Sequence, residues 1–208
     1  MGWCAWRTVR AGGHWAVLIK TNTVIMSKLE KELENAKEQL RQVISSRKMN
    51  DYFSAHSAVL SLERKVAAEH MDEYAETIDF PVKWDAGAPM PHLLTNGYHT
   101  ILLFYLPDES SKNRRTESVA LVQFHRCMSS KLGDPNEEVF HGHPLHGKGL
   151  EPCTAQIVQN SKWIKELESI NQVHSQYNPE LWRSLNHYIF FATVHLEQRR
   201  RVEGEKSE

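Results

Sequence analysis

Three histidines, His141, His143 and His146, lie within six consecutive positions and follow two glutamates, Glu137 and Glu138. Imidazole is the commonest metal ligand in proteins and the only side chain that ordinarily changes charge near neutral pH. In an extended segment the first two imidazoles point to the same side, and the third can return across the intervening proline turn. With one glutamate, the three would form a four-ligand site, or a three-ligand site with an open position, for zinc or another divalent metal.

The chemistry of such a site depends on its open position. A metal-bound water there would give a hydrolase in which His143 and His146 are ligands. Glu137 or Glu138 would be a further ligand or the general base, so the candidate catalytic residues are these two glutamates and His143. The same segment also suits an ordinary tight loop, because its glycines and proline favour turns and the chain holds 12 histidines in all. No His-Glu-x-x-His signature is present, so the sequence favours a structural or ligand-binding loop.

Composition and charge exclude several classes of function. Lys plus Arg is 25 and Asp plus Glu is 26, a net charge of -1, so we expect neither a nucleic-acid partner nor a basic membrane-binding surface. Three scattered cysteines favour a reducing, cytoplasmic compartment, and we expect Cys127 and Cys153 to be buried and inert. The apolar stretch Ala16–Ile19 is far too short to span a membrane.

The N-terminal 25 residues differ in character from the rest of the chain. They contain no continuous apolar run of signal-peptide length and precede Met26-Ser27, where a strongly patterned helix begins. The sequence favours a non-native or disordered extension over residues 1–25, and a short edge strand around Ala16–Ile25 is the alternative. The expected organisation is a single α+β domain over 26–197, made of a helical hairpin over 26–74 and a sheet with helices over 78–197, followed by a disordered charged tail over 198–208.

Two amphipathic helices are expected after Ser27, which is a good N-terminal cap. The first reaches about Ser45 and carries apolar residues at alternating spacings of four and three, namely Leu29, Leu33, Ala36, Leu40 and Val43. The second follows Asn50-Asp51 and ends at about His70 or Tyr74. A short polar link predicts an antiparallel helical hairpin. Its apolar stripe either covers the sheet or forms a two-fold dimer, and both alternatives remain open.

A small antiparallel meander is expected next. Ile78–Trp84 suits an edge strand because of its internal proline. The runs His92–Leu94 and His99–Leu106 flank Asn96-Gly97, the strongest short hairpin signal. The second run is apolar on both faces, which marks a central strand covered on both sides. The next strand is expected over Ser118–Cys127, paired with its neighbour in sequence.

The remainder is expected to hold a long loop, two helices and a strand. Met128–Pro152 has no periodicity, and connections of this length are functional or disordered. A helix is expected over Thr154–His174 and a short one from Asn178-Pro179 to about Asn186. Tyr188–Phe191 is expected to be a strand. The predicted fold class is therefore α+β: an N-terminal antiparallel helical hairpin, a small antiparallel meander sheet and two further helices packed on it.

Several motifs resemble a known family. They are Pro135-Asn136-Glu137-Glu138, Gly142-His143-Pro144-Leu145, Gly149-Leu150-Glu151, Asn160-Ser161-Lys162-Trp163 and His187-Tyr188-Ile189-Phe190. With the strand Tyr98–Leu106, they resemble an uncharacterised bacterial protein family, a domain of unknown function, over about residues 91–190. The resemblance implies a fold and no activity. In that family the last strand would continue with an Asp-Ser-Thr-Phe type segment, whereas Phe191–His195 departs from it, which raises the hypothesis of an altered C-terminus that lacks a final strand.

Two classes of function remain. The first is a non-enzymatic cytoplasmic interaction protein, whose helical hairpin and sheet edge contact a protein partner or a second copy. It accounts for the absence of a recognisable catalytic motif. The second is a metal-dependent or histidine-assisted hydrolase built on the loop at residues 128–152. We favour the first.

Overall fold

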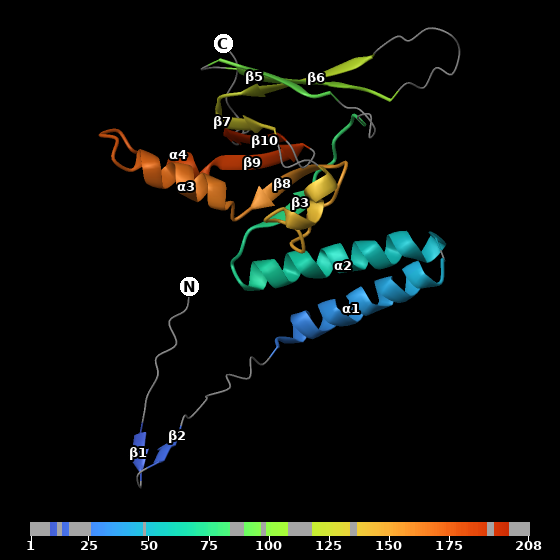
Figure 1. Ribbon diagram of the computed structural model, residues 1–208. Helices are drawn as coiled ribbons and strands as arrows, with labels where there is room; N and C mark the ends of the chain where they lie inside the picture. The colour runs from blue at the N-terminus through green and yellow to red at the C-terminus, as the bar shows by residue number, and fades with distance from the viewer. Residues whose placement is uncertain are drawn as a thin grey trace.

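The computed structural model describes residues 9–11, 14–16, 26–47, 49–83, 90–96, 99–107, 118–133, 137–190 and 194–199. These residues form helices and small antiparallel sheets, so the predicted α+β class is confirmed. Two of the sheets have three and five strands. In Figure 1 the three-stranded sheet lies at the top, the five-stranded sheet lies beneath it, and a pair of helices lies below both. Near the N-terminus, β1 (Val9–Ala11) and β2 (His14–Ala16) pair as a separate antiparallel ribbon.

The predicted helical hairpin is present as α1 (Lys28–Ser45) and α2 (Met49–Glu69). Ser27 caps α1 as expected: its hydroxyl accepts a hydrogen bond from the Glu30 amide, and the Glu30 carboxylate accepts one from the Ser27 amide. Leu33, Ala36 and Val59 are buried together between the two helices. The apolar stripe of α1 is therefore used mainly to hold α1 against α2.

The predicted meander is present as β4 (His92–Thr95), β5 (His99–Tyr105) and β6 (Val119–His125), antiparallel in the order β4-β5-β6. The Asn96 side chain accepts a hydrogen bond from the His99 amide at 2.8 Å and so stabilises the turn between β4 and β5. Arg126 has φ +57°, which ends β6 and reverses the chain into β7.

A second, five-stranded sheet was not expected as such from the sequence. Its members, in spatial order, are β3 (Tyr74–Thr77), β8 (Ala155–Gln159), β9 (Leu185–Phe190), β10 (Val194–Arg199) and β7 (Cys127–Leu132), and every neighbouring pair is antiparallel. The hypothesis of an altered C-terminus that lacks a final strand stays a prediction, although the chain does form a strand after Phe190: β10 lies between β9 and β7. The tail expected from residue 198 begins inside this strand, and residues 200–208 lie outside the described residues.

Two sequence predictions are wrong on helix and strand boundaries. The helix expected over Thr154–His174 is a strand, β8, followed by the shorter helix α3 (Lys162–Asn171). Asn160, with φ +53°, separates the two, and Ser161 caps α3. The edge strand expected over Ile78–Trp84 instead precedes that segment as β3, while residues 78–83 are irregular and Trp84 lies outside the described residues.

Two apolar clusters cover opposite faces of the five-stranded sheet. One lies against the three-stranded sheet and contains Leu102, Phe104, Ala120, Phe124, Ala155 and Phe190. The other contains Ala75, Leu145, Leu150, Val158 and Ile189 and lies under the loop that carries the histidines. The short helix α4 (Pro179–Arg183) begins as predicted, since the Asn178 side chain accepts from the Glu180 amide. Among the described residues, no helix is long and apolar enough to cross a membrane.

Candidate functional site

Residues 137–151, which carry the three clustered histidines, form the histidine loop. It begins with a 3-10 helix, η1 (Glu137–Gly142), and continues through turns to Gly149. Leu145 and Leu150 are 3% and 5% exposed, and both pack against the five-stranded sheet with Phe140 beside them. The expectation of a loop without regular structure over Met128–Pro152 is wrong at its start, where β7 lies, and in its middle, where η1 lies.

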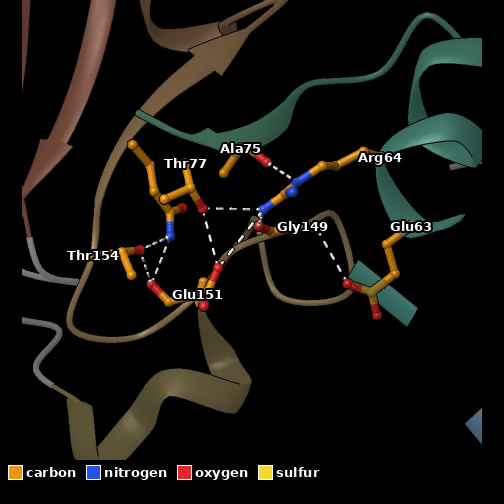
Figure 2. A network of polar contacts seen from close by, with 8 residues as sticks. Glu63, Arg64, Ala75, Thr77, Gly149, Glu151 and Thr154 are labelled. Carbon is orange, nitrogen blue, oxygen red and sulfur yellow. Dashed lines mark hydrogen bonds and ion pairs between the residues drawn. The ribbon is translucent and has the colours of Figure 1, made fainter. Parts of the chain in front are cut away.

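Arg64 of α2 fastens the end of the histidine loop to strand β3 (Figure 2). Its guanidinium donates to the carbonyl oxygens of Ala75 at 2.8 Å and Gly149 at 3.1 Å, and to the Thr77 hydroxyl at 3.3 Å. The planar guanidinium holds several donors in fixed directions, which suits this task better than a lysine would. One side chain thus joins a helix and the strand that follows it to a loop 85 residues further along the chain.

Glu63, the residue before Arg64, holds the same loop from a second side. Its buried carboxylate accepts a hydrogen bond from the Gly149 amide at 3.1 Å, also drawn in Figure 2. Gly149 has φ +80°, and a Cβ atom there would lie 2.5 Å from the Arg64 Cγ and 2.6 Å from the Ala75 carbonyl oxygen. Only glycine fits this close approach of two backbones.

A cluster of charges also fixes the end of the loop. The Lys148 and Lys162 ammonium groups each lie 2.7 Å from a different oxygen of Asp72. These two lysines hold the pKa of the Asp72 carboxyl well below its usual range. The Lys148 carbonyl also accepts from the Ala75 amide at 2.9 Å. Lys148 is therefore tied to the protein through both its side chain and its backbone.

The structure separates the three candidate metal ligands into a buried histidine and an exposed pair. His143 is 6% exposed, and its Nδ1 accepts a hydrogen bond from the Leu145 amide at 3.2 Å. Burial lowers the pKa of His143, partly offset by the nearby Glu73 carboxylate. His143 thus supports the fold of the loop from within.

His141 and His146 meet at the surface of the loop. The distance from the His141 Nδ1 to the His146 Nε2 is 3.0 Å, and the two rings are nearly perpendicular, with centroids 4.8 Å apart. Both residues are exposed. Sequence spacing brought the three histidines near one another, but it could not show which two would share a hydrogen bond.

The three-ligand arrangement is not assembled in the described part of the chain. Within the residues that the structure describes, no three His, Cys, Asp or Glu side chains lie together so as to hold a metal ion. The side chains of Glu137 and Glu138 lie outside the described residues, so their roles as ligand or general base stay predictions. In the described part of the loop, the exposed side chains that could bind a metal ion are the imidazoles of His141 and His146.

Two further sets of reactive side chains lie outside the histidine loop. Cys127 is half-buried and its thiol donates to the Ser129 carbonyl, whereas Cys153 is exposed, so its expected burial is wrong. Ser161 Oγ and His187 Nδ1 lie 2.9 Å apart, a pairing that sequence reasoning missed. Both residues are only 4% exposed, and the Ser161 oxygen also accepts from the Ile164 amide as the cap of α3. This pair is a structural contact, since a substrate could not reach it.

The outer face of the three-stranded sheet is the other candidate site. This outer face is defined here by the residues that alternate away from the core: His92, Leu94, His99, Ile101, Leu103, Tyr105, Val119, Leu121, Gln123 and His125. Leu94, Val119 and Leu121 are 59%, 50% and 61% exposed. None of the ten is Asp, Glu, Lys or Arg, although charged residues make up 25% of the chain. The sequence predicted that β5 is a central strand covered on both sides. In the described part of the chain, no helix or strand lies over the outer face of β5.

Comparison with known proteins adds no relative to these observations. The chain matches no protein-family model, no curated protein and no solved structure. Function must therefore be argued from the two sites themselves.

Proposed function

We propose that this chain is a non-enzymatic interaction protein that self-associates through the outer face of its three-stranded sheet. The observation that carries the proposal is the exposure of Leu94, Val119 and Leu121 on a face without formal charge. Contiguous exposed apolar surface on a folded protein marks an interaction site. The few scattered cysteines support a reducing, cytoplasmic setting, and the balanced net charge supports a protein partner over a nucleic acid.

The absence of charge on the outer face favours a second copy as the partner. A partner that presented charged side chains would bury them against leucines without a counter-ion, which is costly. A second copy presents the same uncharged residues, and a two-fold axis brings identical patches together. Two sheets stack well face to face at about 10 Å, with side chains of the two faces interdigitated.

The size of the outer face sets the expected strength of the self-association. Its longest strands have seven residues. From a rise of about 3.4 Å per residue and a strand spacing of about 4.8 Å, the face measures roughly 24 Å by 14 Å. That footprint of roughly 340 Å² is smaller than the ~800 Å² that each partner buries in a stable interface. We therefore expect a reversible monomer–dimer equilibrium.

The helical hairpin is a weaker candidate for the contact surface. Its best apolar residues, among them Leu33 and Val59, are already buried between α1 and α2. Phe53 and Ile44 are 71% and 57% exposed, but they sit among polar neighbours. We therefore assign the partner surface to the sheet and test the hairpin beside it.

Sedimentation velocity over a wide range of protein concentrations tests the proposal. The variant Leu121→Lys places a charge on the outer face midway along β6, while Val173→Lys makes the same change at a residue that is 91% exposed and outside it. We expect concentration-dependent dimers for the wild type, for Val173→Lys and for Phe53→Lys, and monomers for Leu121→Lys. A wild type that stays monomeric throughout, or a Leu121→Lys variant that dimerises equally well, would overturn the proposal.

A further inference from the structure

The exposed pair of imidazoles on the histidine loop has a geometry that suits a metal ion. One ring nitrogen of His141 and one of His146 are 3.0 Å apart and share a hydrogen bond, so one proton lies between the two. A metal ion can take the place of that proton, since the second lone pair then becomes available. Both rings are exposed, so rotation about their side-chain bonds can turn both lone pairs toward the ion.

The distance between the two nitrogens is compatible with both binding one ion. With metal–nitrogen bonds of about 2.0 Å, a nitrogen separation of 3.0 Å corresponds to an angle of about 97° at the metal. This angle lies between the 90° of neighbouring ligands in tetragonal sites and the ~109° of tetrahedral zinc, so a tetragonal ion fits the pair, and among divalent first-row ions Cu²⁺ generally binds nitrogen sites most tightly. Tetragonal nitrogen sites are typical of Cu²⁺ and Ni²⁺, and imidazole is a good ligand for both.

We propose that His141 and His146 form a two-imidazole site for a divalent copper or nickel ion, with water at the remaining positions. His143 is not a ligand, because it is buried and its Nδ1 already accepts from the Leu145 amide. The proposal thus retains two of the three histidines expected from the sequence and replaces zinc with ions of tetragonal preference. It goes beyond self-association and is independent of it, because the histidine loop contributes no residue to the outer face.

The backbone of the loop prepares the pair for binding. The His143 amide donates to the Phe140 carbonyl at 3.1 Å, and the His146 amide donates to the His143 carbonyl at 2.9 Å. The Phe140 ring packs against both imidazoles, with centroids 6.0 Å from His141 and 5.5 Å from His146. A preformed pair loses less conformational entropy on binding, which favours affinity.

The test is a Cu²⁺ titration of the full chain, followed by calorimetry and electron paramagnetic resonance at about pH 7.5, where imidazole is mostly neutral. We expect one ion in the tightest class of sites, with nitrogen hyperfine splitting from two imidazoles. His141→Ala and His146→Ala should each weaken this class at least about tenfold, since even an outer-shell partner of a metal ligand is worth that much. The matched control is His174→Ala, another exposed histidine outside the histidine loop, which should bind as the wild type does.

Two results would overturn the site. One is a His141→Ala variant that binds Cu²⁺ with wild-type affinity and an unchanged spectrum. The other is an equal loss of binding in His174→Ala, which would indicate scattered histidine binding. Both substituted histidines are exposed, and circular dichroism will show that the variants fold. Sedimentation in the presence of a chelator keeps the result separate from self-association.

Discussion

The histidine loop and the outer face of the three-stranded sheet differ in residue types and in how the structure uses them. The loop has the residues that suggest chemistry, yet Leu145, Leu150 and His143 are buried in it and Arg64 and Glu63 hold its end in place. The outer face has leucine, isoleucine and valine, which suggest a core, yet Leu94, Val119 and Leu121 are half or more exposed. Residue type alone would have assigned function to the loop and packing to the face. The burial of the loop residues and the exposure of the outer-face residues reverse part of that assignment.

The largest effect is expected at Gly149, where the loop comes closest to α2 and β3. Gly149→Ala should cost about 3 kcal/mol of unfolding free energy, because strain at positive φ adds to a clash with the Ala75 carbonyl and the Arg64 side chain. Gly147→Ala is the matched control, since φ is +75° there and its Cβ would meet nothing within 4 Å. That variant should lose only about 1 kcal/mol. Urea denaturation measures both, and equal losses would show that the loop is not held by this close approach.

The next largest effect is expected for Arg64. Arg64→Met keeps most of the side-chain volume but leaves the carbonyls of Ala75 and Gly149 without their charged donor, at a cost of about 2 kcal/mol. Arg41→Met removes an exposed ion pair with Glu38 on α1 and should change stability by less than ~0.5 kcal/mol. The same denaturation experiment compares them. If the two variants were equally stable, the histidine loop would be no better anchored than the helix surface.

A smaller effect of pH is expected on folding, through His143. Burial lowers the pKa of His143 below its unfolded value, so the unfolded chain binds more protons and stability declines as pH falls below about 6.5. His143→Asn can keep an acceptor for the Leu145 amide without titrating and should show a shallower decline between pH 8 and pH 5. His141→Asn, at an exposed histidine, should retain the wild-type slope. The low pKa of Asp72 acts in the same direction but only in the range where carboxyls protonate, below this window.

The sequence predicted correctly those parts of the fold whose signals lie within a short stretch of the chain. The Ser27 cap, the spacing of apolar residues in α1 and the Asn96-Gly97 turn are local, and the elements they predict were confirmed. The five-stranded sheet was not expected, because two of its strand pairs, β3 with β8 and β10 with β7, join distant parts of the chain. In Ala155–Gln159 the apolar residues fit both a strand and the start of the following helix, which is why β8 was taken for helix.

The sites were predictable to a similar extent. Clustering in sequence placed His141, His143 and His146 in one loop, but burial of the middle one depends on the sheet beneath it. Apolar residues on both faces of β5 were visible in the sequence, whereas the uncovered state of one face was not. Arg64 gave no signal, because an arginine on an amphipathic helix usually faces solvent.

The most direct test of the central claim is isotope-filtered NMR on an equal mixture of ¹³C-labelled and unlabelled protein. If the chain self-associates as proposed, intermolecular nuclear Overhauser effects will connect the methyl groups of Leu94, Leu103 and Leu121 to the same face of the other copy. The exposed Ile44 methyls of the helical hairpin will show none. Intermolecular effects confined to the hairpin, or their absence at concentrations where the protein sediments as a dimer, would contradict the assignment of the outer face as the interaction surface.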